Sequence, residues 1–163
     1  SSGCSDRPRD SASFQPEATD PVAEQRLLQL TEVARDDPRA AYDLGLRYFR
    51  GDGVRQDSYQ ALKWMRDAGE RGVVPAQLAL GRFYLMGLEE MGPDPAEAET
   101  WLSMAAAKGN KEARRLLPQA QAAKKDEKSA YEWREANRKN WYGGWYGTYS
   151  YYWYWGPNGW KYR

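Results

Sequence analysis

The chain has 163 residues, enough for one ordinary domain, and its charges almost cancel, because 24 Lys and Arg face 23 Asp and Glu. A net charge near +1 gives no general attraction to nucleic acid or acidic lipid. With no histidine and a single cysteine, the sequence excludes Ser-His and Cys-His nucleophile pairs, imidazole metal ligands and an internal disulfide. We therefore expect no cofactor and no metal site.

Residues 1–19 contain few apolar side chains and many Ser, Asp, Arg and Pro. Such a segment cannot bury enough surface to offset its chain entropy, so it is expected to be a disordered tether. Within it, Ser2-Gly3-Cys4-Ser5 resembles the end of a bacterial lipoprotein signal, in which small residues precede a cysteine that is lipidated. That resemblance implies lipidation at Cys4 and a periplasmic, outer-membrane-anchored protein. A stray cysteine in a flexible tail is the alternative.

Helix starts are marked by caps along residues 20–110. Asp or Asn accepts hydrogen bonds from free backbone N–H groups at an N-cap, and Pro at the next position loses no donor that the helix needs. The pairs Asp20-Pro21, Asp37-Pro38 and Asp94-Pro95 have this form, and Asp57 and Asn110 are single caps. The predicted helices span about 21–35, 38–49, 58–69, 75–86, 95–108 and 110–117.

Two stretches within this region repeat each other. Leu44-Gly45, Tyr48, Gly51, Asp57, Ala61, Trp64, Ala68 and Gly72 recur as Leu80-Gly81, Tyr84, Gly87, Asp94, Ala98, Trp101, Ala105 and Gly109. The offset is 36 residues before the inner loop and 37 after it. A unit of this size cannot bury its own apolar face, so it has to stack on its neighbours.

The repeated pattern A-x-x-x-L-G-x-x-Y-x-x-G-x-G-V-x-x-D-x-x-x-A-x-x-W-x-x-x-A-x-x-x-G closely resembles Sel1-like repeats, which are relatives of the tetratricopeptide repeat. Residues 40–72 follow it almost position by position, and residues 76–109 follow it with one insertion, at which Glu89-Glu90-Met91 replaces the Gly-x-Gly-Val turn. The resemblance implies an all-α fold, a short α-solenoid of antiparallel helix pairs, whose concave face binds proteins or peptides without catalysis.

Helical spacing assigns the repeat aromatics Tyr48, Trp64, Tyr84 and Trp101 to the core. The better binding candidates are the pattern-free positions on the first helix of each pair, which line the concave face of such solenoids. These are Tyr42, Asp43, Arg47, Gln77, Arg82 and Phe83. Charged residues of alternating sign, among them Arg50 and Asp52, are assigned to a solvated face. The acid pairs Glu89-Glu90 and Glu97-Glu99 have no context for glycosidase chemistry, which disfavours a hydrolase.

The C-terminal third differs from the repeats. Residues 118–140 are rich in Ala, Glu, Lys and Arg, with little apolar periodicity, and predict a solvent-exposed helix. In residues 141–163, twelve of 23 side chains are Trp or Tyr. Gly156-Pro157-Asn158-Gly159 is a turn signal, which predicts a small β-hairpin with Trp155 near Trp160.

An isolated hairpin is marginally stable, so this aromatic tail has to lie against something. Four interpretations stay open: docking to a protein partner, stacking on a glycan, anchoring at a membrane interface, or folding back onto the solenoid. The candidate contact residues in the tail are Trp141, Trp145, Tyr149, Tyr152, Trp153, Trp155 and Trp160.

The sequence therefore divides into a tether (1–19), a repeat solenoid (20–117), a charged helix (118–140) and an aromatic tail (141–163). The leading hypothesis is a non-enzymatic interaction scaffold of the bacterial envelope that binds a protein partner, with no nucleic acid and no membrane contact beyond a lipid anchor. The alternative is a cell-wall or exopolysaccharide-binding protein that uses the tail.

Overall fold

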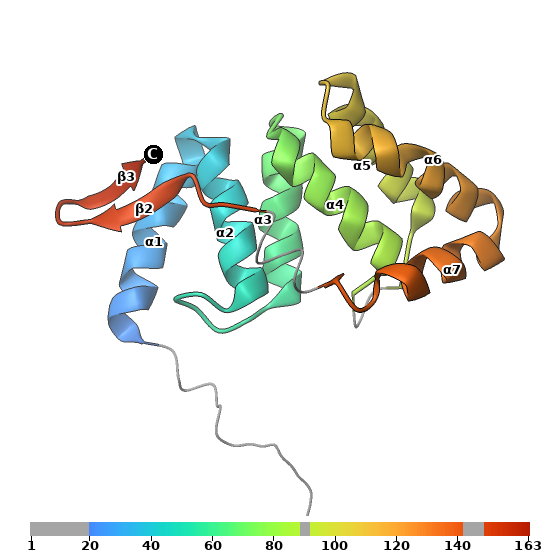
Figure 1. Ribbon diagram of the computed structural model, residues 1–163. Helices are drawn as coiled ribbons and strands as arrows, with labels where there is room; N and C mark the ends of the chain where they lie inside the picture. Colours follow the sequence, from blue (N-terminus) through green and yellow to red (C-terminus); the bar gives the residue numbers. More distant parts are fainter. Residues whose placement is uncertain (1–19, 89–91, 142–148) are drawn as a thin grey trace, which may run out of the picture.

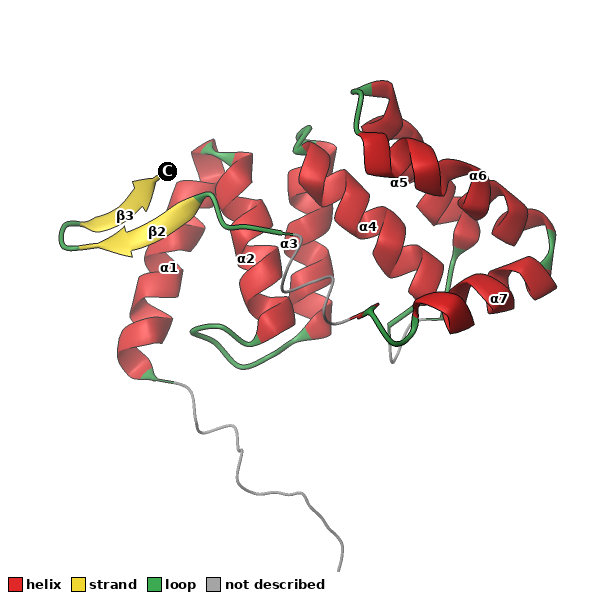
Figure 2. Cartoon of the chain, in the orientation of Figure 1, coloured by secondary structure: helices red, strands yellow, loops and turns green. Residues whose placement is uncertain are grey.

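A computed structural model describes residues 20–88, 92–141 and 149–163. The expected tether, with Cys4, and the tail residue Trp145 lie outside these ranges. Within them the chain forms seven helices and two strands (Figures 1 and 2). These are α1 (Pro21–Asp36), α2 (Pro38–Arg50), α3 (Ser58–Glu70), α4 (Val74–Met86), α5 (Pro95–Ala107), α6 (Lys111–Lys125), α7 (Glu127–Asn137), β2 (Trp153–Gly156) and β3 (Gly159–Tyr162).

The predicted caps are the ones the structure uses. Side-chain oxygens of Asp20, Asp37, Asp57, Asp94 and Asn110 accept hydrogen bonds from backbone N–H groups two or three residues later, at 2.8 to 3.1 Å. Pro follows directly in α1, α2 and α5, where it costs no intrahelical bond. The starts of five helices were therefore readable from short local signals.

The helices follow one another in a row, as expected for a short solenoid (Figure 1). Consecutive helices pack together from α1 to α7, with the tightest association inside the pairs α2–α3 and α4–α5. Small residues allow this approach: a Cβ atom added to Gly81 of α4 would lie 2.4 Å from Leu102 Cδ2 of α5. The repeat pattern therefore keeps glycine where the helix pair closes.

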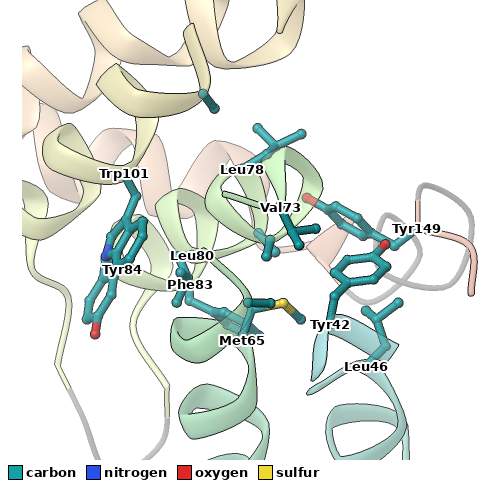
Figure 3. Close-up of a cluster of buried hydrophobic side chains, with 14 of the residues drawn as sticks. Tyr42, Leu46, Met65, Val73, Leu78, Leu80, Phe83, Tyr84, Trp101 and Tyr149 are labelled. Carbon is teal, nitrogen blue, oxygen red and sulfur yellow. The ribbon is translucent and has the colours of Figure 1, made fainter. Parts of the chain in front are cut away.

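The core confirms most of the assignments made from helical spacing. Tyr84 and Trp101 are buried between α4 and α5, whereas Tyr48 and Trp64 are half-buried and pack against the edge of the core (Figure 3). Trp64 is less covered because it borders an open cavity of about 530 Å³ between α1 and α3. A single helix, α1, covers this end of the stack, and it leaves part of the Trp64 ring uncovered.

The predicted helix end at Pro118 is wrong. α6 runs through Pro118 to Lys125, and Ala113, Leu116, Ala120 and Ala123 form one buried stripe that spans the proline. Burial of this stripe on α5 outweighs the loss of one backbone hydrogen bond. The helix ends instead at Asp126, whose carboxylate caps α7 by accepting from Lys128 N and Ser129 Oγ. The single exposed helix expected at 118–140 is thus two segments.

The predicted hairpin is confirmed. β2 and β3 are antiparallel, and Trp155 pairs with Trp160, with their ring centroids 5.5 Å apart in an edge-to-face arrangement. Pro157 and Asn158 form the connection, and Gly159 has a positive φ of 106°. The hairpin does not extend back to Tyr149; residues 149–152 lead into it as an irregular segment that bends at Tyr152 and crosses α2 (Figure 1).

Candidate functional site

The C-terminal tail lies on the surface made by the first helices of the repeats. We call this surface the tail groove; it is formed by Tyr42, Asp43, Arg47 and Arg50 of α2 and Arg82 of α4. The sequence places these residues at pattern-free positions, so they are not needed to stack one repeat on the next. In the structure they hold residues 149–153.

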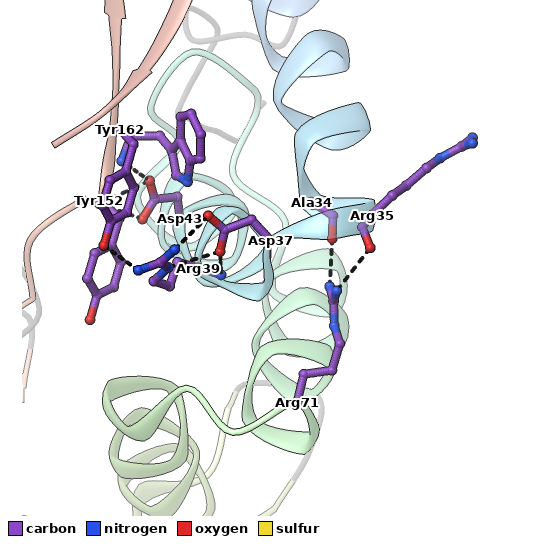
Figure 4. A network of polar contacts seen from close by, with 9 residues as sticks. Ala34, Arg35, Asp37, Arg39, Asp43, Arg71, Tyr152 and Tyr162 are labelled. Atoms are coloured by element: carbon purple, nitrogen blue, oxygen red, sulfur yellow. Dashed lines mark hydrogen bonds and ion pairs between the residues drawn. The ribbon is translucent and has the colours of Figure 1, made fainter.

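Asp43 is the centre of the groove. Its carboxylate is completely buried and accepts the N–H of Tyr152 at 2.9 and 3.1 Å and the N–H of Trp153 at 2.6 Å (Figure 4). Burial raises the pKa of Asp43 to about 7, although these N–H groups and nearby Arg47 favour the charged form. One side chain thus binds two consecutive backbone donors of the tail.

Two arginines of α2 bind the carbonyl groups of the same segment. Arg47 Nη2 donates to Trp153 O at 3.4 Å, and Arg50 Nη2 donates to Tyr149 O at 2.7 Å. The Arg47 guanidinium also lies 3.9 Å from the centroid of the Tyr151 ring. Because N–H and C=O groups are both recognised, side chains of α2 bind the main chain of the segment, which bends at Tyr152.

Aromatic side chains of the segment fill the space beside these contacts. The Tyr152 ring meets Tyr42 edge-on at 5.5 Å, and Tyr149 lies beside Tyr42 in the core (Figure 3). Burial raises the pKa of Tyr149 to about 12, and its hydroxyl accepts from Arg82 at 3.3 Å. Arg82 also donates to Glu112 of α6 at 2.6 Å, so the segment contacts residues from two repeats.

The hairpin continues the contact beyond the groove, along α1 and the start of α2. Trp160 Nε1 donates to the carbonyl oxygen of Arg26 at 2.6 Å. The guanidinium groups of Arg26 and Arg39 lie 4.9 and 4.2 Å from the ring centroids of Trp155 and Tyr162. Arg39 also donates to the Tyr162 hydroxyl and is held by Asp37 (Figure 4). Cation–π contacts thus fix the aromatic face of the hairpin.

The structure brings together four of the six residues predicted on the concave face. Tyr42, Asp43, Arg47 and Arg82 all touch the tail. The other two belong to the core: Gln77 donates to Gly69 O at 3.0 Å, and the Phe83 ring lies edge-on to Phe49. The expected exposure of these residues is wrong, because the chain covers this face with its own tail, and their binding of a partner stays a prediction.

Among the tail candidates, folding back on the solenoid accounts for most of the rings. Trp141 packs edge-on against Phe83, and Tyr149, Tyr152, Trp153 and Trp160 contact the helices or the groove. Trp155 keeps 37% of its surface exposed. The sequence analysis missed Arg26 of α1 and Arg39 of α2. The assignment of Arg50 to a solvated face is wrong, because this half-buried side chain donates to Tyr149 O.

Several carboxylates outside the groove are held in ion pairs. Glu97 is bound by Arg66 at 3.2 Å and Glu99 by Lys124 at 3.0 Å, while Glu112 is held by Arg115 and Arg82, which lower its pKa to about 2. In the described ranges, no three Cys, Asp or Glu residues gather as metal ligands. None of the helices there has the length and apolar character to cross a membrane.

Comparison with known proteins identifies the repeats. The Sel1 repeat model matches residues 38–73 and 74–110. A crystal structure of a Sel1 repeat protein from Oxalobacter formigenes is 31% identical, with a TM-score of 0.53, and the match covers 70% of this chain and 89% of that one. The crystal structure of c5321, a protective antigen present in uropathogenic Escherichia coli strains and displaying an SLR fold, is 32% identical with a TM-score of 0.54; 70% of this chain matches 25% of it.

A curated relative, the uncharacterized protein NMB1327 of Neisseria meningitidis serogroup B, is 33% identical over 91 residues. That match covers 56% of this chain and 18% of the relative, so the chain spans under a fifth of its length.

Proposed function

The chain belongs to the Sel1-repeat proteins, and on that premise we propose that it is an interaction scaffold of the bacterial cell envelope that holds a partner protein on its concave face and tail. Sel1-repeat proteins are generally non-catalytic scaffolds for protein interactions. The observation that carries the proposal is the tail groove, in which Asp43, Arg47 and Arg50 bind the main chain of a tail segment. Such a surface is built to bind peptide.

Site-specific photocross-linking in the source bacterium tests where a partner binds. One photoreactive residue replaces Arg39, at the exposed rim where the hairpin meets α2, and another replaces Tyr59 of α3, which is 75% exposed on the second helix of its pair. We expect a protein adduct from position 39 and none from position 59. Adducts from position 59 alone would place the partner on the opposite face and contradict the proposal.

The envelope location is supported by the sequence around Cys4, which resembles a lipidation site. A lipid anchor on Cys4 followed by a polar segment would tether the repeats to a membrane surface. Mass spectrometry of the native N-terminal peptide is expected to show a diacylglyceryl modification on Cys4. A peptide that carries an unmodified Cys4 would exclude the anchor while leaving the scaffold function untouched.

Glycan binding is the second candidate, and the partly exposed rings of Trp155 and Tyr162 favour it. Aromatic rings exposed on a hairpin can stack on sugar faces. If this candidate is correct, replacing Trp155 by Ala abolishes sedimentation with purified cell-wall polysaccharide and leaves the cross-link from position 39 in place. If polysaccharide binding is absent from the unmodified protein, the candidate is excluded.

A further inference from the structure

The tail occupies its own groove in the way that a bound peptide would. Its residues 149–152 lie outside helices and strands and bend at Tyr152, and the backbone of 149–153 is bound at both N–H and C=O groups by side chains of α2. None of these groove side chains is required by the repeat pattern. A segment that serves only as a lid would not need three polar side chains aimed at its main chain.

The fit of the tail is also incomplete. Arg47 Nε is buried without a hydrogen-bond partner among the described residues. Each unpaired buried polar atom destabilises the docked state. Beside the Tyr152 ring an open cavity of about 570 Å³, lined by Arg39, Val73 and Pro75 among others, is left unfilled. The groove therefore has a hydrogen-bond donor that the tail leaves unpaired and a cavity that the tail does not fill.

We propose that the tail groove is a self-occupied peptide site, in which a Tyr- and Trp-rich segment of a partner protein displaces residues 149–153 and places a further side chain in the cavity beside Tyr152. This site rests on the proposed scaffold function: the partner segment is its ligand, and the chain's own residues 149–153 compete with that ligand. Asp43 is the anchor, because it binds two consecutive backbone N–H groups whatever side chains they carry.

A partner segment is favoured over the tail of a second copy. An exchanged tail would make the same contacts that it already makes within its own chain, so it gains nothing to offset the entropy of association. A separate segment can pair with Arg47 Nε and fill the cavity. It must still compete with a tethered tail, whose effective concentration is of the millimolar order.

The test keeps the folded chain and cuts only the tether of the tail. A protease site is inserted between Gly143 and Gly144, the full-length protein is cut after folding, and binding of a fluorescent peptide of residues 149–163 is followed by anisotropy. We expect the cut protein to bind the peptide at least about 10-fold more tightly than the uncut protein, because the resident tail has lost its tether.

The backbone contact is tested with two N-methylated peptides. Methylation of the Tyr152 amide removes a hydrogen that Asp43 accepts and should weaken binding about 10-fold or more. Methylation at Ser150, whose side chain is exposed, is the matched control and should change binding little. In cut protein that carries Asp43→Asn, the two methylated peptides should bind with similar affinity. The Asp43 carboxylate and the Tyr152 N–H act as a pair, so removing the second partner costs little once the first is gone.

Three outcomes would overturn the proposal. The first is that the cut tail remains in place against excess peptide. The second is that the solenoid loses its helical circular dichroism when the tail leaves. The third is that both methylated peptides bind equally to cut protein in which Asp43 is intact. Binding of the peptide only by a dimer of the uncut chain would identify a second copy as the occupant and would likewise overturn it. Because the cross-links from positions 39 and 59 are read on the uncut chain, the scaffold function stands or falls separately.

Discussion

At the scale of single residues, Asp43 shows what could be predicted from the sequence and what could not. Its place on the first helix of a repeat, outside the repeat pattern, was enough to predict that it lies on the binding face. What it binds could not be predicted, because the partner atoms are backbone N–H groups 109 and 110 positions later in the chain. No local pattern links groups so far apart.

Replacing Asp43 by Asn should release the tail. Asn keeps the size of the side chain but loses the charge and one of the two acceptor oxygens that receive the N–H groups of Tyr152 and Trp153. A buried donor that loses its acceptor costs about 1–3 kcal/mol, so the free energy of unfolding should fall by about 2 kcal/mol. Urea denaturation followed by tryptophan fluorescence measures this change.

Glu132→Gln is the matched control, because Glu132 lies exposed on α7. The urea midpoint of Glu132→Gln should equal that of the unmodified protein within experimental error. An Asp43→Asn protein with an unchanged midpoint, and with tail amides still protected from hydrogen exchange, would mean that Asp43 does not hold the tail.

The raised pKa of Asp43 makes stability depend on pH in a defined direction. The folded state binds a proton at this carboxyl up to about pH 7, whereas the unfolded chain releases it near pH 4. The folded state therefore carries more protons in this window, and the contribution of Asp43 to stability should decline as the pH rises from about 5 toward 7. Because the chain has no histidine, few other groups titrate in the upper part of this window, above about pH 6.

The check is a series of urea unfolding curves between about pH 4.5 and about pH 7.5, a range in which the raised carboxyl changes its charge. The unmodified protein should lose stability across this range, and Asp43→Asn should show a flatter profile. Equal slopes for the two proteins would assign the pH dependence to other groups.

At the scale of elements, the caps correctly predicted five helix starts, whereas Pro118 led to a wrong prediction of a helix end. Five starts follow from Asp or Asn side chains bound to the first turn, which is a purely local interaction. The end of α6 is decided by tertiary packing instead. The buried stripe that includes Leu116 and Ala120 continues on both sides of Pro118, so the helix continues as well.

Pro118→Ala should therefore stabilise the protein. Alanine restores the N–H that can donate to the Arg114 carbonyl one turn earlier, and it removes the clash of the proline ring with that carbonyl. Because the side chain at 118 is exposed, no packing is lost, and the free energy of unfolding should rise by about 1–3 kcal/mol.

Pro95→Ala is the control for this substitution. Pro95 is the first residue of α5, where its missing N–H costs no intrahelical bond, so the same replacement should change stability little. Thermal unfolding by circular dichroism compares the two. If Pro118→Ala lowers the midpoint, the proline is needed for the course of α6, and the account of the helix given above is wrong.

At the scale of the whole molecule, the repeats determined the solenoid because each unit contacts its neighbours in the sequence. The hairpin was also predictable, since a turn signal and β-forming residues are local. The position of the hairpin was not. It depends on contacts between guanidinium groups of α1 and α2 and aromatic rings more than 100 residues later in the chain. The sequence therefore left open whether the tail contacts a protein partner, a glycan, a membrane interface or its own solenoid.

Truncation after Trp141 should leave a folded but weaker solenoid. Loss of residues 142–163 uncovers Tyr42 and leaves the buried Asp43 carboxylate without its N–H donors. Burial of one large aromatic side chain contributes about 1.5–3 kcal/mol, so we expect a loss of about 3 kcal/mol after the chain entropy of the tail is regained. Cooperative unfolding should persist, because the helix pairs α2–α3 and α4–α5 keep their contacts.

Adding the missing piece should reverse the loss. A peptide of residues 149–163, supplied at about 100 times its dissociation constant, should restore about 2.7 kcal/mol to the truncated protein, because a ligand stabilises the folded state that binds it. A second truncation, after Trp160, is the control: it removes Tyr162 from beside Arg39 but keeps the residues that occupy the groove, and it should cost far less. If the peptide leaves the midpoint of the longer truncation unchanged, the tail stabilises the solenoid only as a covalently attached part of the fold.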